Sequence, residues 1–167
     1  TDISWSGTLA MPTMWGAGTR TLTSSAVTTI AQLAGSSITL TRGDTLSVAI
    51  TGLGTFANYS NLYFTVKSRR EDLDAASIIQ IKKNTAGTGD GLTWLNGAAP
   101  TITEGSITID DAVAGNITVM IKAASTALLV LAESGWDVQI VRSAGTPVST
   151  LSSGVFIVVG DYTRAVV

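Results

Sequence analysis

The stretch from Ile38 to Thr51 reads ITLTRGDTLSVAIT, in which apolar and hydroxyl side chains alternate on both sides of Arg42-Gly43-Asp44. Alternation of period two with β-branched residues is typical of strands that are buried on one face. Gly43 can adopt the positive φ that a tight turn requires. We therefore predict two strands joined by a turn, and we interpret the Arg-Gly-Asp tripeptide, which also spells an integrin-binding motif, as part of that turn.

The same alternation recurs along the rest of the chain, between short runs that contain Gly, Asn or Asp. About eight short strands with this spacing predict an antiparallel sandwich or barrel. Many of the outward positions in these runs hold Thr, whose hydroxyl group takes the place of a charged side chain. This explains why only 13% of the residues are charged. The further runs with this pattern are residues 62–67, 106–110, 117–122, 136–141, 147–151 and 154–159.

Two segments depart from the alternation and predict one or two short helical turns. Residues 70–78 begin with acidic side chains and continue with Ala, which suits the start of a helix. Residues 123–132 are rich in Ala and Leu and fit one turn or two. Residues 84–91 are rich in Gly and Thr, and we interpret them as a flexible loop.

The first 37 residues differ in character from the rest, since they hold two of the four Trp, two of the three Met and only two charged side chains. A segment of about 35 residues cannot bury enough surface to fold alone. We therefore predict an N-terminal arm or added strands at 1–37 and a β-sandwich domain at 38–167. Trp and Met are enriched where proteins meet, so we expect the arm to dock on a partner; folding back onto its own sandwich is the alternative. The expected docking residues are Trp5, Met11, Met14 and Trp15.

The composition excludes several kinds of active site. The chain has no Cys and no His, which rules out disulfides, Cys- or His-ligated zinc, iron–sulfur clusters and the Ser-His-Asp triad. The acidic pairs Asp72/Asp74 and Asp110/Asp111 are interpreted as helix-start and turn residues, because no EF-hand spacing surrounds them. We predict a protein that is not an enzyme, with no catalytic residues, no cofactor and no metal.

Charge and hydropathy restrict the partners. The net charge is −2 and no basic stripe is present, so we expect no nucleic-acid binding. The longest apolar run, Ala127 to Ala132, is far shorter than the roughly 20 residues of a membrane span. Trp136 opens a strand pattern, and we expect it to cap the core. Trp94 lies in a Gly-containing stretch and is a candidate for surface contact with a glycan or a neighbouring protein.

The order of these segments resembles the N-terminal domain of phage baseplate upper proteins. That family has an alternating strand, an Arg-Gly-Asp-Thr turn and a second alternating strand, then an aromatic-Thr-Val-Lys strand and an Asp- and Ala-rich short helix. The resemblance spans about residues 38–164 and implies an immunoglobulin-like β-sandwich that serves as a virion module without catalysis. The matching segments are residues 38–48, 62–67, 72–80, 111–117, 136–140 and 154–164.

The resemblance turns the all-β prediction into a functional hypothesis. We expect a structural protein of a tailed-phage virion, assembled in the host cytoplasm, that docks on other virion proteins in the tail, the baseplate or the capsid exterior. Repeated virion positions imply a homo-oligomer or a symmetric array. The arm at 1–37 has no counterpart in the family, which leaves open a capsid decoration protein that grips shell subunits. A carbohydrate- or cell-surface-binding module that uses Trp94 is a further alternative, and a hydrolase would need two carboxylates facing one cleft.

Overall fold

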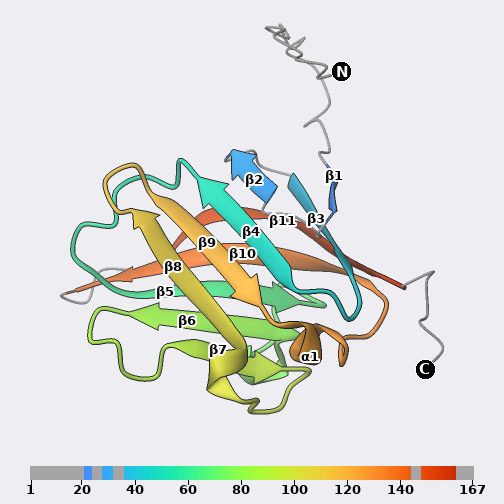
Figure 1. The fold of residues 1–167 in the computed structure, drawn as a ribbon. Helices are drawn as coiled ribbons and strands as arrows, with labels where there is room; N and C mark the ends of the chain where they lie inside the picture. Colours follow the sequence, from blue (N-terminus) through green and yellow to red (C-terminus); the bar gives the residue numbers. More distant parts are fainter. Residues whose placement is uncertain (1–20, 24–27, 32–35, 144–147, 161–167) are drawn as a thin grey trace, which may run out of the picture.

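Two β-sheets pack face to face in the computed structural model, which describes residues 21–23, 28–31, 36–143 and 148–160. Figure 1 shows the strands of the smaller sheet crossing those of the larger sheet. Within the described residues, the larger sheet has seven strands, in the order β1 (Thr21–Thr23), β3 (Ser36–Thr41), β11 (Ser149–Val159), β10 (Glu133–Arg142), β5 (Tyr59–Lys67), β6 (Ile79–Asn84) and β7 (Gly91–Leu95). The smaller sheet has the order β2 (Thr28–Ala31), β4 (Leu46–Thr51), β9 (Asn116–Ile121) and β8 (Gly105–Asp111).

The strand order is that of an immunoglobulin-like sandwich of the variable type. Its two sheets pair the strands B-E-D on one side and G-F-C-C′-C″ on the other. Here β4-β9-β8 and β11-β10-β5-β6-β7 occupy these places. The sandwich predicted from the alternation is therefore confirmed. Three pairs of strands are parallel, namely β1 with β3, β3 with β11 and β2 with β4.

The alternation in the sequence selects the side chains that reach the core between the sheets. In β4, Leu46, Val48 and Ile50 are buried while the residues between them are partly exposed. The turn that precedes this strand is also as predicted, because Gly43 has φ +93° and the Asp44 N–H donates to the Thr41 carbonyl at 3.1 Å.

A pair of aromatic side chains lies in the core where antibody domains have a Trp packed on an inter-sheet disulfide. Phe64 on β5 is fully buried, and its ring stacks on Trp136 of β10 with centroids 5.9 Å apart and planes at 27°. The chain has no Cys, and aliphatic side chains such as Val48 and Val138 fill the space between the sheets. The expectation that Trp136 belongs to the core is confirmed, since 2% of it is exposed.

Gly154 allows three neighbouring strands to approach one another at this point. It lies opposite Trp136 in the β10–β11 ladder and opposite Ser36 in the β11–β3 ladder. The indole N–H of Trp136 donates to the Ser36 carbonyl at 3.2 Å. A Cβ on Gly154 would lie 1.9 Å from that carbonyl oxygen and 2.8 Å from the indole nitrogen. Only a residue without a side chain fits here.

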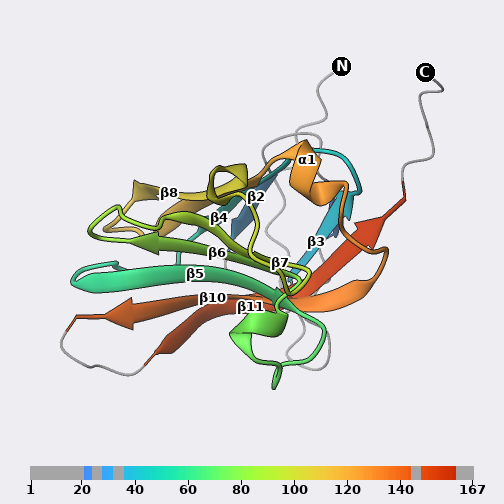
Figure 2. The same cartoon turned by 90° about the horizontal axis from the view of Figure 1, so that it is seen from below.

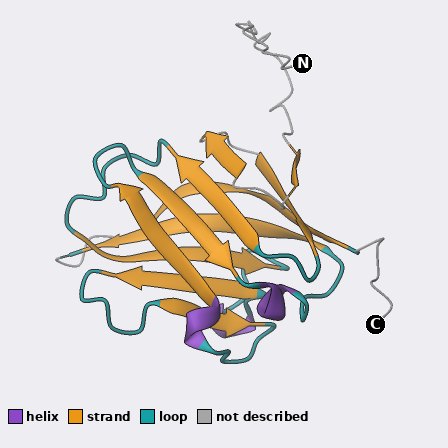
Figure 3. Cartoon of the chain, in the orientation of Figure 1, coloured by secondary structure: helices purple, strands orange, loops and turns teal. Residues whose placement is uncertain are grey.

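The helical segments are short and lie at the margins of the sheets (Figure 3). Both expected turns are present, as the 3₁₀ turn η1 (Asp74–Ala76) and the single α-helical turn α1 (Ala123–Thr126). A further 3₁₀ turn, η2 (Ile102–Glu104), was not predicted. Among the described residues no helix approaches the length that a bilayer crossing requires.

The strands β7 and β11 differ from the sequence prediction for an identifiable reason. In β7, Leu92 and Leu95 both face the core with two residues between them, because the register with β6 shifts at Thr93. This bulge breaks the period of two that identifies a strand in the sequence. In β11, two predicted runs form one strand, and Leu151 occupies a bulge opposite β10. Because of the bulges, neither strand shows a continuous alternation of buried and exposed residues in the sequence.

Part of the N-terminal segment lies in the sheets. Thr21–Thr23 and Thr28–Ala31 add β1 to the larger sheet and β2 to the smaller one, and β3 begins at Ser36. The predicted docking residues Trp5, Met11, Met14 and Trp15 lie outside the described residues.

Candidate functional site

The outer face of the larger sheet carries a continuous row of polar side chains. Gln80, Thr65, Asp137 and Ser153 are cross-strand neighbours on β6, β5, β10 and β11. Cross-strand neighbours on one face lie within contact of one another. Two pairs of consecutive strands, β5 with β6 and β10 with β11, thus bring together one amide, one carboxyl and two hydroxyl groups.

A hollow of about 440 Å³ opens over this row. Its walls come from β5, β10 and β11 and from the loop that follows β5. Gly135 contributes no side chain, and a Cβ there would meet nothing nearer than 3.9 Å, which leaves open space over the strands. We call this the polar hollow. The polar side chains that line it are Thr65, Lys67, Ser68, Arg70, Asp137, Gln139, Thr150 and Ser153.

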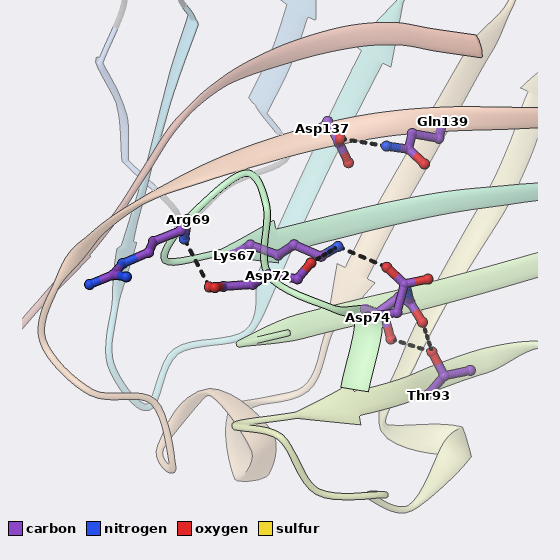
Figure 4. Close-up of polar contacts among 8 residues, drawn as sticks. Lys67, Arg69, Asp72, Asp74, Thr93, Asp137 and Gln139 are labelled. Atoms are coloured by element: carbon purple, nitrogen blue, oxygen red, sulfur yellow. Dashed lines mark hydrogen bonds and ion pairs between the residues drawn. The ribbon is translucent and has the colours of Figure 1, made fainter. Parts of the chain in front are cut away.

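Ion pairing holds the loop beside the polar hollow in place (Figure 4). The ammonium of Lys67 donates to Asp74 Oδ1 and to the Asp72 carbonyl, both at 2.8 Å. The Arg69 N–H donates to Asp72 Oδ2 at 3.0 Å. The hydrogen bond from Lys67 holds the pKa of Asp74 below its usual value. In Figure 2, the green turn η1 and its loop lie against the outer side of the larger sheet.

The two acidic pairs have the structural roles that their positions indicate. Asp111 Oδ1 accepts hydrogen bonds from the N–H groups of Val113 and Ala114, both at 2.9 Å, in the β8–β9 turn. Asp110 accepts from the Thr118 hydroxyl at 2.8 Å. Within the described part of the chain, no group of three or more acidic side chains is placed to hold a metal ion.

Asp137 is the carboxylate among the side chains that line the polar hollow. Its Oδ2 accepts from the Gln139 side-chain amide at 2.8 Å, whereas its Oδ1 is buried and has no hydrogen-bond partner. Burial raises the pKa of this carboxyl above its ordinary value, although Gln139 and the charges of Lys67 and Arg70 act in the opposite direction. Titratable groups whose pKa is shifted by their surroundings are found preferentially at functional sites.

We expect the substitution Asp137→Asn to raise the stability of the protein at neutral pH. The raised pKa means that the folded state binds the proton more readily than the unfolded chain, so the ionised carboxylate lowers stability above the folded-state pKa. Asn has the same shape and no charge. Thermal unfolding near pH 7 should show a Tm higher by about 2–4 °C for each kcal/mol of penalty removed.

The pH dependence separates this effect from a general change in packing. As pH falls through the folded-state pKa, wild-type Asp137 takes up its proton and regains the stability, so the difference from Asn should shrink. The control is Asp110→Asn, which changes a carboxylate on the other sheet. A difference between wild type and Asp137→Asn that stays constant down to about pH 4 would contradict this account.

A second surface lies beside α1, in the connection that leads from α1 to β10. Residues 128–131, here called the apolar loop, connect α1 to β10, and Leu128, Val130 and Leu131 are 64%, 70% and 50% exposed. Asn96 anchors the loop by donating its side-chain N–H to the Leu128 carbonyl at 2.9 Å. A cleft of about 610 Å³ adjoins Leu128, with Ala98, Ala99, Pro100 and Ala124 in its walls. Exposed apolar groups of this kind mark docking surfaces.

Trp94 lies on the outer face of β7, at the edge of the larger sheet, and it is half-buried. It is the cross-strand neighbour of Gln80, in the same row as Asp137 but three strands away. At about 4.8 Å per strand this separation is roughly 14 Å. The structure does not bring Trp94 and the polar hollow together as one site.

Sequence reasoning missed the polar hollow and the apolar loop. The alternation at 136–140 already places Asp137 and Gln139 on the outward face. Their partners on β5 and β11 follow only from strand pairing. The apolar loop was included in a predicted helical segment, but α1 ends at Thr126, which leaves the next apolar residues without a helix face to bury.

Comparison with known proteins gives structural likeness only. No protein-family model matches the sequence, and no curated protein matches it. The structure of the NK cell receptor Nkp44 is similar, with 18% identity over 82% of this chain and 100% of that chain and a TM-score of 0.44. The N-terminal domain of phage TP901-1 ORF48 is similar with 11% identity, coverage of 84% and 95%, and a TM-score of 0.38. A structure from a study of multimeric cell-adhesive interactions of VGSC beta subunits has 11% identity, coverage of 76% and 92%, and a TM-score of 0.35.

Proposed function

We propose that this chain is a non-enzymatic structural protein of a tailed-phage virion that acts by docking on other virion proteins. The exposed apolar loop carries the docking part of the proposal. Leu128, Val130 and Leu131 follow one another closely in a connection whose backbone is tied to Asn96. The hydrogen bond to Asn96 restrains the loop backbone before binding, which lowers the entropy that the loop loses when it docks.

The placement in a virion is supported by the sequence, because the segments between residues 38 and 164 resemble those of phage baseplate upper proteins and follow one another in the same order. That resemblance implies an immunoglobulin-like sandwich, and the chain has this fold. The proposal includes three positions in the virion, namely the tail, the baseplate and the capsid exterior. Each position repeats by symmetry, so the partners are other virion proteins and further copies of this chain.

Electron cryo-microscopy of the intact particle that carries this chain tests the placement. Density at the tail tip or baseplate would support the adaptor position, and density between shell subunits would support capsid decoration. Complete absence of the protein from purified particles would refute the proposed function.

The double substitution Leu128→Ser and Val130→Ser is expected to reduce incorporation into particles by about tenfold, equal to about 1.4 kcal/mol of binding free energy. Both side chains are exposed, so the folded domain should keep its stability within about 0.5 kcal/mol. Quantitative mass spectrometry of purified particles measures the incorporation.

The matched control replaces two apolar side chains that are exposed elsewhere. Leu73 and Val113 are 78% and 84% exposed, in the loop before η1 and in the β8–β9 turn. Leu73→Ser with Val113→Ser should leave incorporation unchanged. Equal loss in both double variants would show that surface hydrophobicity in general, rather than the apolar loop, governs assembly.

A further inference from the structure

Asn96 and Gly97 form a tight, exposed turn at the end of β7. Both residues have positive φ, +49° and +74°, as the centre of a two-residue turn of type I′ requires. Leu95 and Ala98, on either side of them, exchange both backbone hydrogen bonds, at 2.9 and 3.0 Å. Of the five Asn in the sequence, Asn96 is the only one that is followed by Gly.

An Asn that precedes Gly is chemically reactive toward its own backbone. The backbone nitrogen of the next residue loses its proton to hydroxide and attacks Cγ of the Asn side chain. As the N–Cγ bond forms, Nδ2 takes a proton from water and leaves as ammonia, which gives a cyclic imide. Water then opens the ring at either carbonyl carbon, and the product is aspartate or isoaspartate. A following Gly favours the attack, because it has no Cβ beside the nucleophile.

Two hydrogen bonds of the folded domain oppose this attack. The Gly97 N–H, whose nitrogen is the nucleophile, donates to the Ser77 carbonyl at 3.0 Å. The side-chain amide of Asn96 donates to the Leu128 carbonyl at 2.9 Å. The nucleophile must lose its proton and the side chain must turn toward it, so both hydrogen bonds have to open first. The fold therefore slows the reaction at Asn96 and links it to the release of the apolar loop.

We propose that Asn96 is a site of deamidation, and that its conversion to aspartate loosens the apolar loop. An ionised carboxylate only accepts hydrogen bonds, so the product no longer donates to the Leu128 carbonyl and faces it as a second acceptor. The reaction also places a negative charge in the wall of the cleft beside Leu128, which Asn96 lines. The chemical step is independent of the proposed function, whereas any loss of docking that follows from it rests on that function.

The first test is peptide mapping by mass spectrometry of the full chain kept in mildly alkaline buffer. Asn58 is the internal control, since it is also exposed and has a similar φ of +56°, but it precedes Tyr59. We expect Asn96 to change to aspartate and isoaspartate while Asn58 stays intact. In urea the reaction at Asn96 should be about 10 to 100 times faster, because two hydrogen bonds no longer hold the reacting groups.

The second test uses Asn96→Asp, which reproduces the aspartate product, and measures its effect on the apolar loop. Amide hydrogen exchange is followed at Leu128 and Leu129, whose N–H groups donate to carbonyl oxygens of α1, both at 3.1 Å. We expect exchange at these amides to be about five times faster than in the wild type, the effect of losing one hydrogen bond. Asn58→Asp, with the same change of charge at another exposed turn, should leave it unchanged.

The results that would overturn the inference are equally specific. They are conversion of Asn58 as fast as that of Asn96, equal rates at Asn96 in the folded and the urea-unfolded chain, and an Asn96 that stays intact in the folded chain beyond the limit of about 100-fold slowing. Unchanged exchange at Leu128 and Leu129 in folded Asn96→Asp would overturn the link to the apolar loop. None of these measurements uses virus particles, so they decide the inference whether or not the proposed function holds.

Discussion

Gly154→Ala should lower the free energy of unfolding by about 3 kcal/mol, at the upper end of the usual cost of overpacking a core. The new Cβ would lie 1.9 Å from the Ser36 carbonyl oxygen and 2.9 Å from its carbon. These are backbone atoms of β3, which cannot rotate away as a side chain can. The strand must shift, and the buried hydrogen bond from the Trp136 indole to the same oxygen is then strained as well.

Urea unfolding measures this loss as a lower midpoint with an unchanged slope. The matched control is Gly135→Ala, on the adjoining strand of the same sheet, where a Cβ meets nothing nearer than 3.9 Å. This control should stay within about 0.5 kcal/mol of the wild type. If Gly154→Ala is as stable as Gly135→Ala, the close approach of β3, β10 and β11 does not limit the fold.

Local patterns were sufficient to predict most strands of this sandwich. At β4, burial of alternate residues is visible in the sequence because one face of the strand meets the core and the other does not. The turn at Gly43 was predictable for a similar reason, since few residues other than Gly adopt a positive φ without strain. Both features depend on a few neighbouring residues and on nothing distant.

Features that depend on pairing between distant strands could not be predicted. The bulge at Thr93 is defined by the register between β6 and β7, and the sequence of β7 alone does not reveal it. The polar hollow requires β5, β10 and β11 to lie side by side, although 65 residues separate the end of β5 from the start of β10 in the sequence. An outward Asp is ordinary in a strand, and only its neighbours make Asp137 unusual.

The structure of the apolar loop could not be predicted from its amino-acid composition. The run from Ala127 to Ala132 contains good helix-forming residues, yet only Leu129 of its leucines and valine is buried. The Thr126 hydroxyl, at the end of α1, has its single proton within reach of two carbonyl acceptors: that of Asp44 across the molecule at 2.6 Å and that of Ala123 within the turn at 3.0 Å. The contact with Asp44 ties the end of α1 to the loop before β4, and Leu128, Val130 and Leu131 beyond it lie at the surface.

Phe64→Ala is expected to cost about 3–5 kcal/mol, the range for removing a buried aromatic ring. Phe64 is fully buried, and its ring stacks on Trp136 in the middle of the core. The chain has no disulfide between its sheets, so side-chain packing alone holds them together in this region. For a protein with a typical stability of 5–15 kcal/mol, this single change removes a large fraction of the total.

The companion variant Phe64→Leu distinguishes the ring contact from simple volume. Leu keeps most of the apolar bulk but cannot stack on the indole, so it should recover all but about 1–2 kcal/mol of the loss. Leu73→Ala, at a side chain that is 78% exposed, should have almost no effect. Urea midpoints for the three variants should therefore rank Phe64→Ala well below Phe64→Leu, and Leu73→Ala at wild type. If Phe64→Leu were as unstable as Phe64→Ala, the contact between the two rings rather than the buried apolar area would account for the stabilising effect of Phe64.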